Sequence, residues 1–338
     1  MSRRALPLAS ALLLAGCDYY ERQSMLHAAG PQAERAETLW WFLFWTAAVV
    51  WVAVTATLLW AAFHRRRPAE DPVTHQVAPE VQRTMARAVV SAVGVTTLIL
   101  FAFLFASFRT GRAVTIPPAG QPLTIEVTGH QWWWEVQYAD TNASRRLTTA
   151  NEIHIPVGRP VILKMSSPDV IHSLWIPNLA GKRDLIPGKV STMWLRADSA
   201  GIFRGQCAEF CGHQHAKMAL FVVAEPPERW AAWYERQLQP APQFTDSVLK
   251  RGGEVFMASA CVMCHAIDGT PAGSNVGPNL THIGSRLTIG AGTLPNARGN
   301  LAGWILDPQR IKPGANMPPN QIAPQDLQAL LGYLESLR

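Results

Sequence analysis

Two long apolar runs dominate the N-terminal third of the chain. Residues 38–63 and 88–108 contain no charged side chain. Helices of this length cross the roughly 30 Å hydrocarbon core of a bilayer. The alternative is a pair of buried core helices, but two uncharged runs in one chain favour the membrane. We therefore expect residues 38–112 to form a two-helix transmembrane hairpin.

From residue 113 the pattern changes to short segments broken by Gly and Pro. Several segments alternate apolar and polar positions or are rich in β-branched residues, which is typical of strands. Many short strands predict a small sandwich or barrel, an all-β domain over residues 113–225. The expected strands are Leu123–Thr128, Glu152–Ile155, Val161–Ser166, Lys189–Leu195 and Met218–Val223.

Helical spacing returns after the β-rich region. Residues 226–242 predict a short amphipathic helix and a linker, which Pro240 and Pro242 end. Residues 243–338 predict an all-α domain, with helices expected at Phe244–Ser259 and Asp326–Leu337.

The N-terminus carries export signals. Residues 1–16 combine two arginines with an apolar run that is too short to span a bilayer, which predicts a signal peptide. The sequence Leu14-Ala-Gly-Cys17 resembles the bacterial lipobox. It implies lipidation of Cys17 and a lipidated N-terminal segment over residues 17–37. An ordinary signal peptide with an incidental cysteine is the alternative.

Charge agrees with this topology. The net charge is +6, and residues 1–112 supply most of it, with eleven arginines against seven acidic residues. Arginines gather between the two apolar runs, which places that loop in the cytoplasm and both termini outside. Because the later regions are nearly neutral, a nucleic-acid partner is disfavoured.

The segment from Cys207 to Met218 gathers two thiols, imidazoles, a carboxylate and a thioether within twelve residues. Soft sulfur ligands beside imidazole favour copper, whereas zinc would gain nothing from Met218. A disulfide between Cys207 and Cys211 is the alternative, since exported proteins oxidise free thiols. The five cysteines are an odd number, and each has a place in a cofactor or lipid motif, so no structural disulfide is expected.

This loop resembles the binuclear CuA centre of cytochrome c oxidase subunit II, whose pattern C-x-E-x-C-x-x-x-H-x-x-M is matched at each defined position. The resemblance implies a cupredoxin domain of Greek-key barrel type that binds two copper ions. His213 stands where that family has a small polar residue and is left out. The implied ligands are His172, Cys207, the backbone carbonyl of Glu209, Cys211, His215 and Met218.

The same resemblance implies two further roles. The segment Gly129-His130-Gln131-Trp132-Trp133-Trp134-Glu135 matches a second family signature, in which Trp132 is an exposed aromatic residue where electrons enter. The Glu209 side chain would bind a magnesium ion at the contact with subunit I. The family's proton-pathway glutamate is not assigned to Glu80 or Gln82, because the surrounding motif differs.

A third motif lies in the C-terminal region. Cys261-Val-Met-Cys264-His265 is a haem c attachment motif: both thiols bond the haem covalently and His265 binds the iron. The later segment Lys312-Pro-Gly-Ala-Asn-Met317-Pro resembles the methionine loop of class I cytochromes c, which implies that Met317 is the second axial ligand. Zinc or redox use of the cysteines is the alternative.

Together these resemblances imply subunit II of a caa-type cytochrome c oxidase in the bacterial inner membrane. Electrons would arrive at haem c from a cytochrome c or a cytochrome bc complex, pass through CuA, and reach subunit I. There oxygen is reduced, with proton translocation; subunit III is a further expected partner. The catalytic site is on another chain. A CuA-containing nitric oxide reductase subunit and a copper- or haem-binding lipoprotein remain as alternatives.

Overall fold

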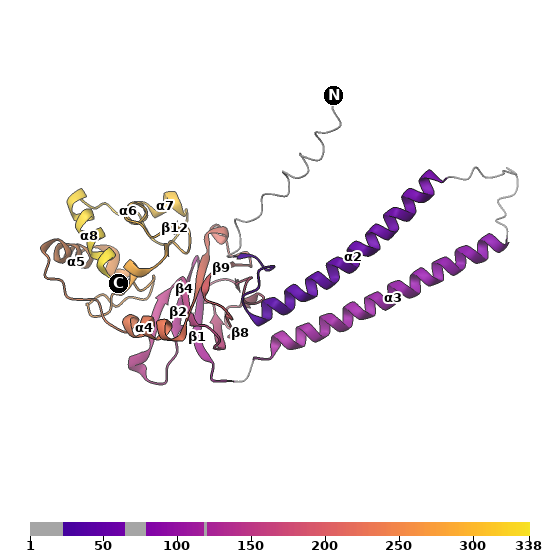
Figure 1. Cartoon of the computed structure of the whole chain (residues 1–338). Helices are drawn as coiled ribbons and strands as arrows, with labels where there is room; N and C mark the ends of the chain where they lie inside the picture. The colour runs from indigo at the N-terminus through magenta and orange to yellow at the C-terminus, as the bar shows by residue number, and fades with distance from the viewer. Residues whose placement is uncertain (1–22, 65–78, 118–119) are drawn as a thin grey trace, which may run out of the picture. The chain divides into compact units, whose positions relative to one another are not determined.

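The structure is a computed structural model that describes residues 23–64, 79–117 and 120–338 (Figure 1). Cys17, the expected signal peptide and most of the arginine-rich loop lie outside the described residues. Residues 34–116 form one compact unit, and the other described residues form a second.

The first unit consists almost entirely of two long apolar helices, α2 (Pro31–Phe63) and α3 (Pro79–Thr115). Each begins with proline, whose fixed φ suits the first helical turn, and each has an acidic residue in that turn. Their most apolar stretches are not buried at all by protein. So large an apolar surface is suited to lipid rather than water, and it confirms the predicted helix pair. Phe42 contacts Phe103, and Arg35 Nη1 donates to Ala113 O over 2.7 Å.

The second unit begins with a β domain, defined here as residues 123–225, which is a sandwich of two five-stranded sheets. One sheet has the order β3-β2-β1-β5-β8 and the other β4-β10-β9-β6-β7. The pairs β1–β5 and β4–β10 are parallel. The strands are β1 (Leu123–His130), β2 (Trp133–Tyr138), β3 (Leu147–Ala150), β4 (Glu152–Pro156), β5 (Val161–Ser166), β6 (His172–Trp175), β7 (Arg183–Leu185), β8 (Ser191–Leu195), β9 (Gly201–Cys207) and β10 (Ala219–Glu225).

The predicted all-β fold is confirmed, because alternate strand residues fill one core between the sheets. Ile125 and Val127 on β1 and Trp134 and Val136 on β2 are completely buried. All five expected strands are present within a few residues of their predicted ends. The other five were not predicted, and β6 and β9 among them carry residues of the copper motif.

A linker helix, α4 (Pro227–Gln237), packs on this sandwich. Trp233 stacks on His154 with ring centroids 4.0 Å apart, and Tyr234 Oη donates to Arg145 O over 2.5 Å. After the helix, Ala241 N donates to Asp268 O over 2.8 Å. The linker is therefore attached along its length.

The last part is a helical domain, defined here as residues 247–338. Its elements are α5 (Ser247–Ala258), α6 (Arg298–Leu306), α7 (Pro308–Ile311) and α8 (Pro324–Ser336), with a short hairpin of β11 (Thr288–Ile289) and β12 (Leu294–Pro295). Asp246 caps α5 by accepting from Val248 N and Leu249 N. Helices α5 and α8 approach so closely that a Cβ on Gly252 would lie 2.2 Å from Ala329 O. Only glycine fits there.

Candidate metal and haem sites

The copper motif lies where three strands of one sheet end together. Cys207 is the last residue of β9, and Met218 immediately precedes β10, its antiparallel partner. Cys207 N donates to Met218 O over 2.9 Å, which closes the loop between them. His172 begins β6, on the other side of β9. Strand pairing therefore brings His172 close to Met218, although the two residues lie 46 positions apart in the sequence.

All six predicted ligands converge at this end of the sheet. Cys207 Sγ lies 3.7 Å from Cys211 Sγ, 3.8 Å from His172 Nδ1 and 3.2 Å from Glu209 O. Cys211 Sγ lies 3.7 Å from His215 Nδ1 and 3.9 Å from Met218 Sδ. The cysteines are free thiols. Two sulfurs at the centre, with imidazole and thioether on the flanks, fit copper by the chemistry of the donors.

The surroundings prepare these groups to bind a cation. The hydrogen bond with Cys211 lowers the pKa of Cys207 to about 3, so that one thiolate forms readily. The same contact raises the pKa of Cys211. His172 Nε2 lies 2.8 Å from Asp169 Oδ1, which orients the ring with Nδ1 toward Cys207. Burial opposes the charged form of His172, but its bonds to Cys207 and Asp169 outweigh this and raise its pKa.

Two nearby residues point elsewhere. His213 is exposed. Glu209 has an exposed side chain, which accepts from Phe210 N over 3.2 Å, while its carbonyl faces Cys207. The carboxylate is thus directed to the surface, beside the exposed ring of Phe210.

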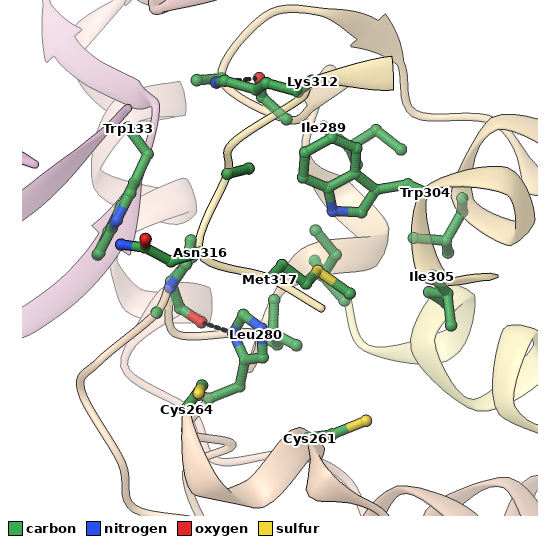
Figure 2. A pocket seen from close by; sticks show the side chains of 18 of the residues that line it. Trp133, Cys261, Cys264, Leu280, Ile289, Trp304, Ile305, Lys312, Asn316 and Met317 are labelled. Carbon is green, nitrogen blue, oxygen red and sulfur yellow. Dashed lines mark hydrogen bonds between the residues drawn. The ribbon is translucent and has the colours of Figure 1, made fainter. Parts of the chain in front are cut away.

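The haem motif lines a cavity of about 450 Å³ (Figure 2). Cys261 and Cys264 lie at one end, on and just after the short 3₁₀ helix Ala260–Met263. Met317 projects into the cavity from the loop after α7, between the cysteine end and the Lys312 end. Apolar residues Leu280, Ile289 and Ile305 form walls.

A backbone carbonyl orients the ring of His265. Its Nδ1 lies 2.8 Å from Pro278 O, and donation to this carbonyl leaves Nε2 with its lone pair. Burial lowers the pKa of His265, which favours the neutral imidazole that a metal requires. A Cβ on Gly277 would lie 2.8 Å from His265 Cε1, so a larger residue at this position would clash with the imidazole ring. The thiols, imidazole, thioether and apolar walls together fit haem c.

Trp132 is not exposed, contrary to the sequence-based expectation. Only 9% of the residue is accessible, because the methionine loop of the helical domain covers it. A Cβ on Gly314 would lie 3.7 Å from its ring. Trp132 Nε1 donates to Cys211 O over 2.8 Å, and the same residue lines the haem cavity. The expectation treated the β domain alone and did not include the domain packed on it.

Sequence reasoning also missed several residues at this junction. Gln214 Nε2 donates to Pro313 O over 2.7 Å, and Ala219 N donates to Ala291 O over 2.9 Å. Lys312 and Arg286 are buried cations that line the haem cavity. The Lys-Pro-Gly motif contained Lys312, but no local pattern shows that its side chain faces another domain.

Two family models match the chain. One describes the periplasmic domain of cytochrome c oxidase subunit II and matches residues 140–225; the other describes cytochrome c and matches residues 249–338. Cytochrome c oxidase subunit 2 of Alkalihalophilus pseudofirmus is 34% identical over 99% of this chain and 97% of that protein. The Bacillus subtilis protein of the same name is 28% identical over 82% of this chain and 80% of its own.

Among solved structures, the periplasmic domain of subunit II of cytochrome oxidase from Bradyrhizobium japonicum is 30% identical. The matched region covers 36% of this chain and 96% of the Bradyrhizobium japonicum chain, with a TM-score of 0.34. The full-length relative matches through both domains and the apolar helices. The chain therefore belongs to the cytochrome c oxidase subunit 2 family, as a member with a cytochrome c domain fused to its C-terminal side.

Proposed function

We propose that the chain receives electrons for a respiratory haem–copper oxidase. In this proposal, haem c is bonded to Cys261 and Cys264 and its iron is bound by His265 and Met317. A binuclear copper centre is held by His172, Cys207, Glu209 O, Cys211, His215 and Met218. These cofactors supply reversible one-electron chemistry, and the protein supplies their attachment, orientation and spacing.

One observation carries the proposal: Trp132 touches both sites. Its indole N–H donates to the carbonyl of Cys211, and the residue is part of the lining of the haem cavity. The residue thus links the two sites through one hydrogen bond and van der Waals contact. Electrons would enter the chain at haem c, from a cytochrome c or cytochrome bc complex, and pass at Trp132 to copper.

The remaining partners in this proposal are supported by membership of the subunit 2 family. Subunit I would receive the electrons, reduce oxygen to water and translocate protons, with subunit III beside it. The exposed carboxylate of Glu209 would bind magnesium at the subunit I contact. The two helices would lie in the inner membrane of a bacterium with both cofactor domains on the periplasmic side, and Cys17 would carry a lipid.

Metal analysis and electron paramagnetic resonance of the purified full chain test the cofactors. We expect two coppers per haem and a signal from one unpaired electron shared by two copper nuclei. One copper with a mononuclear signal, or zinc with none, would contradict the copper assignment. Assays of the complex that co-purifies, with oxygen and with nitric oxide, then test which gas is reduced. Oxygen consumption is expected.

A further inference from the structure

Lys312 occupies an unusual position between the two cofactor sites. It follows α7 and precedes the Met317 loop, and only 2% of it is exposed. Its Nζ donates to Trp132 O over 2.6 Å and to Gly290 O over 3.0 Å. Trp132 belongs to the β domain and Gly290 to the helical domain. A single ammonium group therefore bonds the backbones of both domains.

No carboxylate in the described part of the chain forms an ion pair with Lys312. Two neighbouring groups act on it: Cys211, which raises the pKa of Lys312 when it is a thiolate, and Lys217, which lowers it. Burial lowers its pKa to about 7. A buried ammonium is unfavourable unless it is paired and hydrogen-bonded. The two carbonyls accept from two of its three N–H groups, so one donor remains for a further acceptor.

The cavity shows where an anion would lie. Lys312 and the cysteine pair stand at opposite ends of it (Figure 2). Haem attached through its vinyl groups at Cys261 and Cys264 carries two carboxylates on the opposite edge of the ring. A second buried cation, Arg286, also lines the cavity, and its Nε has no hydrogen-bond partner among the described residues. Lys312 thus lies at the end of the cavity opposite the cysteines, and Arg286 adds a second cation to the lining.

We propose that Lys312 is a positioning residue, which binds a haem carboxylate and at the same time fixes the helical domain to the β domain at the Trp132 carbonyl. This inference rests on the proposed function, since it concerns the spacing of haem and copper. In this proposal one side chain neutralises a carboxylate at the haem edge and also holds the Met317 loop against Trp132.

The test compares Lys312→Met with Arg310→Met in the full chain loaded with both cofactors. Methionine keeps the length of lysine without its charge or donors. Arg310 is an exposed cation two positions away, so its variant controls for net charge. We expect Lys312→Met to slow copper reduction by haem by about tenfold or more, as for the loss of a charged hydrogen bond. It should also lower the haem reduction potential, because a nearby cation favours reduced iron. Arg310→Met should change the rate by less than about twofold, as an exposed charge does.

Two further measurements separate the possible failures. Lys312→Gln retains a donor for the Trp132 carbonyl but not the charge, and it should still lower the potential. An unchanged potential in both Lys312 variants would overturn the carboxylate contact, and an unchanged rate in Lys312→Met would overturn the positioning role. If the unmodified chain shows no copper reduction by its haem, the proposed function fails, while the potentials still test the carboxylate contact.

Discussion

The copper site and the haem cavity position their cofactor-binding residues in different ways. The copper groups are all within the β domain, on β6, at the end of β9 and in the loop that the pairing of β9 with β10 closes, and their donor atoms already lie close to one another. The haem groups lie on loops around a cavity of about 450 Å³, and residues of the β domain help to line it. A sheet positions small ligands by itself, whereas the helical domain needs its large cofactor as part of the core.

The largest effect is expected from removing a central sulfur. Cys207→Ser should abolish binding of both coppers, because Cys207 Sγ lies within reach of His172, Glu209 O and Cys211. Covalent haem should be retained, since its motif lies in the other domain. Copper analysis and the haem absorption spectrum check this. Retention of two coppers would show that Cys207 is not a ligand on which both coppers depend.

Removing the haem attachment should destabilise the helical domain selectively. In Cys261→Ala/Cys264→Ala the cavity would lack its covalently bound haem. An empty cavity of this size would cost a large part of the free energy of unfolding, which is about 5–15 kcal/mol for a typical domain. Calorimetry should show the helical domain unfolding at a lower temperature. The copper signal should persist at temperatures where the helical domain has melted. Simultaneous loss of both would mean that the sites are not independent.

Replacement of Trp132 should affect the connection rather than either site. Trp132→Ala should slow copper reduction by haem strongly while both cofactors stay bound. Trp132→Phe should slow it less, because the ring remains and only the hydrogen bond to Cys211 O is lost. Rapid-mixing spectroscopy measures these rates. In the unmodified chain the rate should be independent of protein concentration and weakly dependent on salt. A second-order rate would show transfer between molecules.

The smallest effect is expected at His154, the β4 residue on which the linker helix α4 packs. Burial opposes the protonated form of His154, but bonds to Glu152 and Glu225 outweigh it and raise its pKa above 6.5. The resulting stabilisation is present in full below about pH 6.5 and is lost as pH rises through the folded-state pKa. Denaturant unfolding across this range should show the decline. His154→Gln should flatten that part of the pH profile, and an unchanged profile would assign it to other groups.

The sequence predicted the parts of this structure that local patterns determine. The apolar length of α2 and α3, the alternation in β1 and β5, and the spacing of the cysteine motifs each reflect neighbouring residues. Strands β6 and β9 were missed because they are short or mixed in polarity, although their pairing brings His172 to Cys207. The burial of Trp132 and the direction of Lys312 depend on contacts between residues about 180 positions apart, which no local pattern encodes.

The packing of α4 has a consequence for how the haem and copper meet. If the linker were flexible, the helical domain would move relative to the β domain. Each electron transfer would then have to wait until diffusion brought the two domains together. Here Trp233 is stacked on His154 and Tyr234 is bonded to Arg145, and the chain beyond is bonded at Ala241. Because the two domains stay packed together, electron transfer does not have to wait for them to meet by diffusion. Adding glycerol to raise the viscosity of the solvent should therefore leave the rate of copper reduction unchanged.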